Sequence, residues 1–390
     1  MNRHLKKTVR ALVCFLLLFG LTGCWDSREL DTLSIVTGVG IDASRKADQL
    51  ELTFQIGKTE KEPGKEASGG TGSAFLLMEA SDPNLLSGME TLKFQNSRAL
   101  FLHHNQVIIF GKDLAEKGIK SYLDIFMRSH ETRMEVWLLV ADGDARSILK
   151  TETQQDKISA VSITRMILNQ RKVSQQTGVN LLNFTSQLMD KTISPTALMI
   201  RNIEQDGEKK LALCGLAVFK DDVMVGQLDN YLTEGFIFGA GDVTGGIVNI
   251  TAEKGTASLN VVKSQCKLTP ILSGDGSITA DMKIKTQLDI GEIHGFQDMN
   301  LMQVEPVLKD YATRDIEMKV QSCFAETQRL NADIYGIGAA VHRSDQKEWK
   351  SMEDIWHQIY PKIKLSLDVQ VEIRGTGKIS DSLTMKEGQS

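Results

Sequence analysis

Cys24 is the residue whose surroundings most clearly predict a chemical reaction. It ends residues 21–24 (LTGC), where small residues before a cysteine would admit a signal peptidase and leave the thiol free to receive a diacylglycerol. This pattern resembles a bacterial lipobox. We expect cleavage before Cys24, which would become the first residue of the mature chain and carry an S-diacylglycerol group and an N-acyl chain.

The segment that would present this cysteine is an N-terminal signal peptide. Residues 1–10 carry four basic side chains and no acid, and residues 11–22 are uncharged. Twelve helical residues extend for about 18 Å, less than the roughly 30 Å hydrocarbon core of a bilayer. This length favours a removable signal peptide, and two acyl chains would give lasting membrane attachment. An ordinary signal peptide cut nearby and a short retained anchor are the alternatives.

The remainder of the chain is acidic. The formal charge is −5 over 390 residues, and the first 23 residues hold only positive charge, so residues 24–390 carry −9. Binding to phosphates needs concentrated Lys and Arg, so this balance goes against a nucleic-acid partner. With 41% hydrophobic and 24% charged residues, the length is sufficient for two or three folded domains.

The other reactive side chains do not occur in known catalytic or metal-binding motifs. The chain has no HExxH, GxSxG, GxxxxGK or CxxC motif. His103 and His104 would need a further ligand from elsewhere to hold a metal. Cys214, Cys266 and Cys323 are odd in number and lie among apolar residues, which is typical of small buried hydrophobic residues rather than disulfides. We predict no catalytic residue, no metal and no cofactor. The dispersed carboxylates cannot be paired without a fold, so a secreted enzyme stays open as an alternative function.

Three turns resemble ligand-binding loops only in part. Residues 38–42 (GVGID) lack the third glycine of a dinucleotide loop, and the glycines of residues 239–246 are out of register with that motif. Residues 142–144 (DGD) resemble the start of a calcium loop, but Arg146 occupies a position that needs an oxygen ligand. We interpret residues 38–42 as part of a hairpin and residues 142–144 as a helix N-cap after a strand.

Strands alternate with helices in the first half of the chain. Apolar alternation predicts a hairpin of strands 33–41 and 50–56, followed by a polar, Gly-rich surface loop over residues 57–73. Asp82 and Pro83 predict the N-cap and first turn of a helix. Leu85, Leu86, Met89 and Leu92 are expected to share one face of this helix. The further predicted elements are strands 74–80, 107–110 and 135–140, a helix over 114–127, and helical segments between 157 and 190.

The second half is richer in strands and then returns to helix. Strands are predicted at 211–220, 223–226, 246–250, 257–262, 277–288 and 362–374, with helices at 304–330 and 349–360. These patterns predict an α+β, multi-domain chain of mixed sheets packed by helices, in two to three lobes. We divide it into a signal peptide (1–23), an N-terminal α/β domain (24–200) and a C-terminal α+β domain (201–390), with a further division near 260 left open.

A series of motifs runs through nearly the whole mature chain. Its members are CWDSREL at 24–30, GVGID at 38–42, SR at 97–98, FG at 110–111, GIKSYLD at 118–124, GLAVFK at 215–220 and DIYGIG at 333–338, with His104, Arg128, Arg133, Trp349 and Trp356. In this order they resemble the Ger(x)C lipoprotein family, the C subunits of spore germinant receptors. His103 departs from the pattern, because a small residue is expected before His104.

The resemblance implies a non-enzymatic lipoprotein on the outer face of the spore inner membrane. It would act with two integral-membrane subunits, of A and B type, in a receptor that senses nutrients and starts germination, and it would be needed for assembly. The resemblance does not say which subunit contacts the nutrient. The alternative is a lipid-anchored solute-binding protein of a transporter, which would have two doubly wound lobes and a cleft between them.

Overall fold

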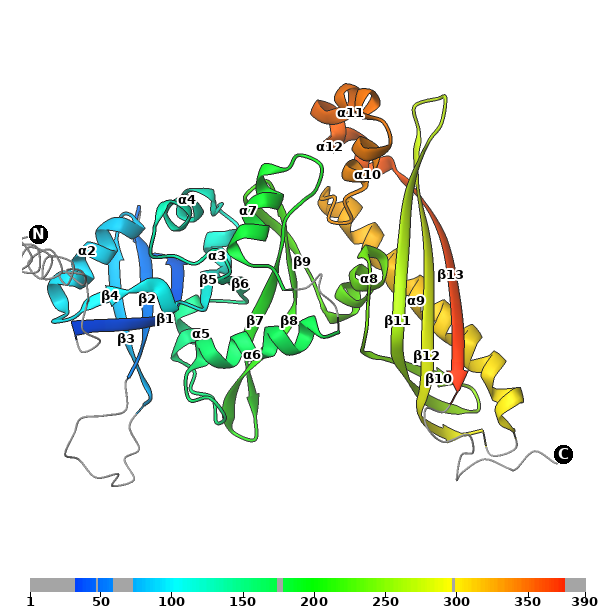
Figure 1. Cartoon of the computed structure of the whole chain (residues 1–390), viewed down its shortest axis with the longest axis horizontal. Helices are drawn as coiled ribbons and strands as arrows, with labels where there is room; N and C mark the ends of the chain where they lie inside the picture. The colour runs from blue at the N-terminus through cyan, green and yellow to red at the C-terminus, as the bar shows by residue number, and fades with distance from the viewer. Residues whose placement is uncertain (1–31, 47, 59–72, 174–177, 297–298, 376–390) are drawn as a thin grey trace, which may run out of the picture.

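Two β-sheets of unequal size lie side by side along the long axis of the molecule (Figure 1). The computed structural model describes residues 32–46, 48–58, 73–173, 178–296 and 299–375. The predicted surface loop over 57–73 falls mostly outside these ranges. The α+β fold class with mixed sheets is confirmed.

The larger sheet has nine strands in the order β3-β2-β1-β5-β6-β7-β8-β9, with β4 beside β1. Four pairings are parallel, namely β1 with β4 and β5, β5 with β6, and β6 with β7, and the others are antiparallel. The strands are β1 (Leu33–Ala43), β2 (Leu50–Gly57), β3 (Phe75–Asp82), β4 (Ala99–Phe101), β5 (Val107–Gly111), β6 (Trp137–Ala141), β7 (Thr196–Gln205), β8 (Glu208–Lys220) and β9 (Val223–Leu228).

The two faces of the large sheet belong to two different hydrophobic cores. Val107 and Ile109 of β5 lie in one core, and Ile108 and Phe110 in the other, as the two-residue period of a strand requires. Helices α5 (Ala145–Lys150) and α6 (Ser159–Arg171) cover the first face. Helices α2 (Leu85–Gln95), α3 (Lys112–Ala115), α4 (Lys120–Arg128) and α7 (Leu181–Met189) cover the second.

Local patterns predicted many of these elements correctly. The hairpin of β1 and β2 is confirmed, and Asp144 caps α5 by accepting a hydrogen bond from the backbone N–H of Ser147. The predicted start of α2 was wrong, because Asn84, not Asp82, is the N-cap. The predicted face of α2 was also wrong for Leu86, which is exposed while Leu85 and Leu92 are buried. The predicted helix over 114–127 is divided into α3 and α4.

The small sheet has the order β10-β11-β12-β13 and is covered by one long helix. Its last two strands pair in parallel, and the other pairs are antiparallel. The small sheet consists of β10 (Ile247–Ala252), β11 (Gly255–Leu272), β12 (Ile278–Gly295) and β13 (Lys364–Gly375). The helices are α8 (Asn230–Ala240), α9 (Leu301–Leu330), α10 (Ile337–Ser344), α11 (Gln346–Met352) and α12 (Trp356–Ile359).

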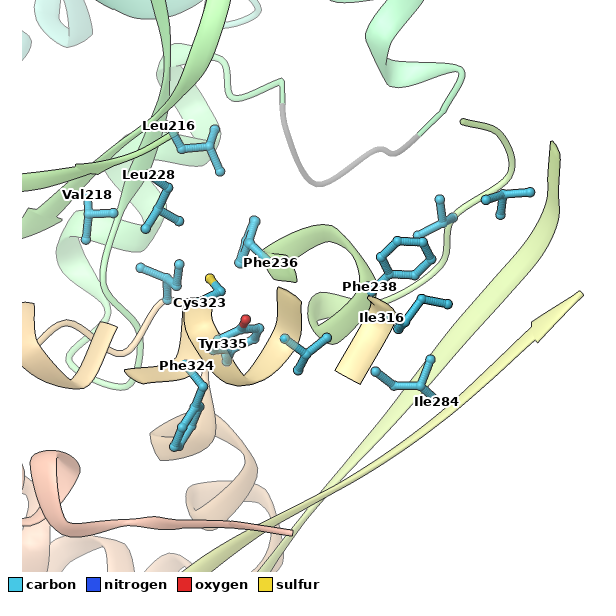
Figure 2. Packing of buried hydrophobic residues seen from close by; sticks show 14 of the residues in the cluster. Leu216, Val218, Leu228, Phe236, Phe238, Ile284, Ile316, Cys323, Phe324 and Tyr335 are labelled. Atoms are coloured by element: carbon cyan, nitrogen blue, oxygen red, sulfur yellow. The ribbon is translucent and has the colours of Figure 1, made fainter. Parts of the chain in front are cut away.

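A continuous hydrophobic core joins the large sheet to the small one (Figure 2). Leu216, Val218 and Leu228 of the large sheet approach Phe236 of α8 and Tyr335 after α9, and the core continues to the small sheet. Gly226 of β9 also fits closely against Leu330, because a Cβ at this position would lie 2.5 Å from a methyl of Leu330. The two parts therefore share packed side chains as well as a connecting chain.

The large sheet extends beyond the predicted domain boundary at residue 200. Strands β7, β8 and β9 run from residue 196 to 228 and complete this sheet. The predicted hairpin at 211–226 is confirmed as the β8–β9 pair. We keep the division into domains as a proposal, and use "large-sheet region" for residues 32–228 and "small-sheet region" for residues 229–375.

Candidate interaction surface

The predicted lipidation site, Cys24, lies outside the described residues. The described chain begins at Thr32, eight positions later, and continues into β1 at Leu33. The first residues of β1 pair in parallel with β4, so that Leu33 lies opposite Ala99. This corner of the large-sheet region is therefore the described part that is nearest along the chain to Cys24.

Helix α2 lies at the same corner. The side-chain amide of Asn96, directly after α2, donates a hydrogen bond of 2.8 Å to the Ser34 hydroxyl. The Asn84 side chain accepts a hydrogen bond from the backbone N–H of Ser87 and so fixes the other end of the helix. Leu85 and Leu92 are fully buried against the sheet. These contacts determine which side of α2 faces outward.

The outward side of α2 presents large apolar residues to solvent. Leu86 is 66% exposed and Phe94 is 86% exposed. Residues four apart share a helix face, so Leu86, Glu90 and Phe94 lie along one stripe, with Lys93 beside them. We name these residues together with Arg98, which follows the helix, the anchor-proximal surface. Its members are Leu86, Glu90, Lys93, Phe94 and Arg98.

The motif at residues 38–42 has a structural role in the large-sheet region. Asp42 accepts hydrogen bonds from the backbone N–H groups of Ala145 (2.7 Å) and Arg146 (3.0 Å), at the N-terminus of α5. Burial raises the pKa of Asp42 to about 6, although the two N–H donors act in the opposite direction. The motif residue Asp42 thus holds a helix end, and the sequence pattern did not reveal this partner.

The motif at residues 333–338 has a similar role in the small-sheet region. Asp333 accepts hydrogen bonds from the backbone N–H groups of Ile337 (2.9 Å) and Gly338 (2.7 Å), which start α10. Burial raises the pKa of Asp333 to about 6 as well. The two tryptophans of the series, Trp349 and Trp356, are buried and packed edge to face, with ring centroids 5.1 Å apart. These motif residues are therefore part of the packing.

The histidines and cysteines singled out in the sequence lie apart from one another in the described ranges or are packed against other residues. No three His, Cys, Asp or Glu side chains there come together as a set of metal ligands. His103 stacks on Phe101, with ring centroids 4.6 Å apart. Burial raises the pKa of Cys214 to about 11 and the pKa values of Cys266 and Cys323 to about 12. Their thiols thus stay protonated at neutral pH, which disfavours nucleophilic chemistry.

The architecture differs from that expected of a solute-binding protein with two similar lobes. One sheet is mixed, with nine strands and helices on both faces, whereas the other has four strands and one long helix. Among the described residues, none of the helices is both long and apolar enough to cross a membrane.

Comparisons with known proteins identify relatives for almost the whole chain. Residues 26–202 match the family model described as spore germination protein N-terminal domain, and residues 214–377 match the model described as spore germination B3/GerAC like, C-terminal. The chain is 24% identical to the putative spore germination protein YfkR of Bacillus subtilis (97% of this chain, 100% of that protein) and 23% identical to its spore germination protein KC (95% and 96%). The crystal structure of the GerBC protein has the same fold, with a TM-score of 0.53 at 16% identity, over 90% of this chain and 100% of that one.

Proposed function

The chain belongs to the Ger(x)C family of spore germination proteins, the C subunits of germinant receptors, and from this premise we propose that it is a lipid-anchored, non-enzymatic receptor subunit. The observation that carries the proposal is the LTGC pattern at residues 21–24, preceded by a basic and then an apolar segment. Acylation at Cys24 would hold an acidic body at an anionic membrane that would otherwise repel it.

The proposed role is assembly with two integral-membrane subunits at the outer face of the spore inner membrane. Confinement to a plane raises the effective concentration of a subunit beside its membrane partners, so contacts of modest affinity are sufficient to hold a complex.

The test compares two cysteine substitutions in the full chain. Cys24→Ala should block acylation of the chain and abolish its recovery with two multi-span receptor subunits after affinity capture. Cys14→Ala is the matched control, because it changes a cysteine of the signal peptide and leaves residues 21–24 intact. Mass spectrometry of the N-terminal peptide should find an acylated Cys24 in the control.

Two results would contradict this proposal. Recovery of the unacylated Cys24→Ala chain with both partner subunits would exclude acylation as the basis of assembly. Recovery of a transporter permease and ATPase with the unmodified chain would instead support the solute-binding alternative.

A further inference from the structure

We propose that the anchor-proximal surface rests on the lipid bilayer, with Leu86 and Phe94 inserted among the lipid headgroups. This inference rests on the proposed function, because it requires acyl chains at Cys24. It goes further by assigning an orientation, in which α2 faces the membrane and the small-sheet region projects away from it (Figure 1).

Helix α2 exposes two large apolar side chains, Leu86 and Phe94, beside the polar Glu90, Lys93 and Gln95 on its outer side. Its inner side buries Leu85 and Leu92 completely, and Gly88 fits closely against Leu52 of the sheet, so α2 is attached to the sheet without any contribution from its outer side. A helix in contact with water on its outer side normally carries polar residues there. Phe94 instead leaves most of a phenyl ring in water, although burial of such a ring contributes about 1.5–3 kcal/mol. The outer side is therefore suited to a second apolar environment.

The position of α2 in the chain indicates a lipid surface as that environment. Cys24 precedes Thr32 by eight residues, which can span at most about 28 Å when fully extended. Ser34, two residues further on, contacts Asn96, and Asn96 is two residues from Phe94. A bilayer that holds acyl chains at Cys24 is thus within reach of the outer side of α2.

Two basic residues lie in the last turn of α2 or shortly after the helix. Lys93 and Arg98 are exposed, and neither has an ion-pair partner in the part of the chain that the structure describes. Together with Glu90 they give this surface a net positive charge, whereas residues 24–390 carry −9. Basic residues at a membrane surface each contribute about 1 kcal/mol of attraction to anionic lipids.

Photo-crosslinking can identify what covers this surface. The full chain is produced with its signal peptide in a sporulating bacterium, with p-benzoylphenylalanine in place of either Phe94 or Met302, and spore inner membranes are irradiated. Met302 is the matched control, because it is 85% exposed and lies in the first turn of α9, which starts at the opposite end of the molecule from α2 (Figure 1). We expect phospholipid adducts on the peptide that contains position 94 and none at position 302.

The same samples separate failure of this inference from failure of the proposed function. An acylated, membrane-retained chain whose position 94 crosslinks to another protein, or to residues 24–31 of its own chain, would overturn the lipid contact alone. A chain that is found unacylated in the soluble fraction would overturn the proposed function and, with it, this inference.

A vesicle assay measures the contribution of the ring. The mature chain with Cys24→Ala lacks the dominant acyl chains, so its weak partitioning onto phosphatidylglycerol vesicles reports the protein surface itself. Adding Phe94→Glu should lower the partition coefficient by about tenfold, whereas Met302→Glu should leave it unchanged. Circular dichroism checks that both variants are folded, and equal partitioning of the two would contradict the proposal.

Discussion

Asp42 in the large-sheet region and Asp333 in the small-sheet region solve the same structural problem in different ways. Each is a buried carboxylate that accepts two backbone N–H groups at the start of a helix, α5 or α10. These N–H groups have no partner within their helix and must be satisfied when they are buried. Both aspartates belong to motifs of the family resemblance, so the motifs mark structural positions.

The two helix ends differ in how many acceptors they have. At α5, Asp144 is the N-cap and accepts from Ser147, so Asp42 is a second carboxylate at the same end. At α10 the N-cap is Gly336, in the left-handed conformation with φ 68°, and it has no side chain that could accept. Asp333 is therefore the side chain that satisfies this end, and we expect the small-sheet region to depend on it more strongly.

The largest predicted effect is that of Asp333→Ala. It leaves the N–H groups of Ile337 and Gly338 buried without an acceptor, which should lower the free energy of unfolding by about 4 kcal/mol. Asp42→Ala should cost about 2 kcal/mol, because Asp144 still caps α5. Urea denaturation of both variants measures the difference. Equal losses would show that the second carboxylate at α5 gives no redundancy.

The second prediction concerns pH and should be similar at both aspartates. Their folded pKa of about 6 lies above the ordinary 3.8, so the unfolded chain ionises first and stability falls as pH rises from about 4 to 6. Each aspartate accounts for about 2 kcal/mol of this loss between pH 4 and pH 7. Asp42→Asn and Asp333→Asn should each be more destabilising at pH 4 than at pH 7 by that amount. Urea denaturation at several pH values measures this difference. The prediction is contradicted if the midpoint depends on pH in the same way in the variants and in the unmodified chain.

The third prediction tests the contact between the two regions. Gly226→Ala places a methyl 2.5 Å from the Leu330 side chain, so it should lower the free energy of unfolding by about 2 kcal/mol. Gly274→Ala is the control, because no atom lies within 4 Å of its Cβ position, and its effect should stay within about 0.5 kcal/mol. Calorimetry measures both, and a neutral Gly226→Ala would indicate a loosely packed junction.

The smallest predicted effect is that of Lys191→Ala. The Lys191 ammonium lies 3.2 Å from a carboxylate oxygen of Glu353 and links the two regions at the surface, but its side chain is 70% exposed. Exposed ion pairs contribute little, so the change in unfolding free energy should stay below about 0.5 kcal/mol. A loss as large as that of Gly226→Ala, measured by the same calorimetry, would show that charge and not apolar packing holds the regions together.

Local patterns in the sequence were sufficient for several elements. The alternation of apolar residues predicted the β1–β2 hairpin and strand β13, and residues 142–144 predicted the cap of α5. Asp333 is also a local signal, because its partners are only four and five residues away. The start of α2 was misplaced because Asp82 and Asn84 are both good capping residues, and only Asn84 accepts the bond from Ser87.

The sequence by itself determined the chemistry expected at Cys24, the strand and helix periods and the order of the family motifs. The tertiary structure decided that Asp42 meets α5 at a distance of 103 residues along the chain, that β7 to β9 complete the large sheet, and that Phe94 and Leu86 remain uncovered. The physical reason is that capping and periodicity depend on neighbours within a few residues. Pairing across a sheet and exposure of a helix face depend on which distant segments pack there.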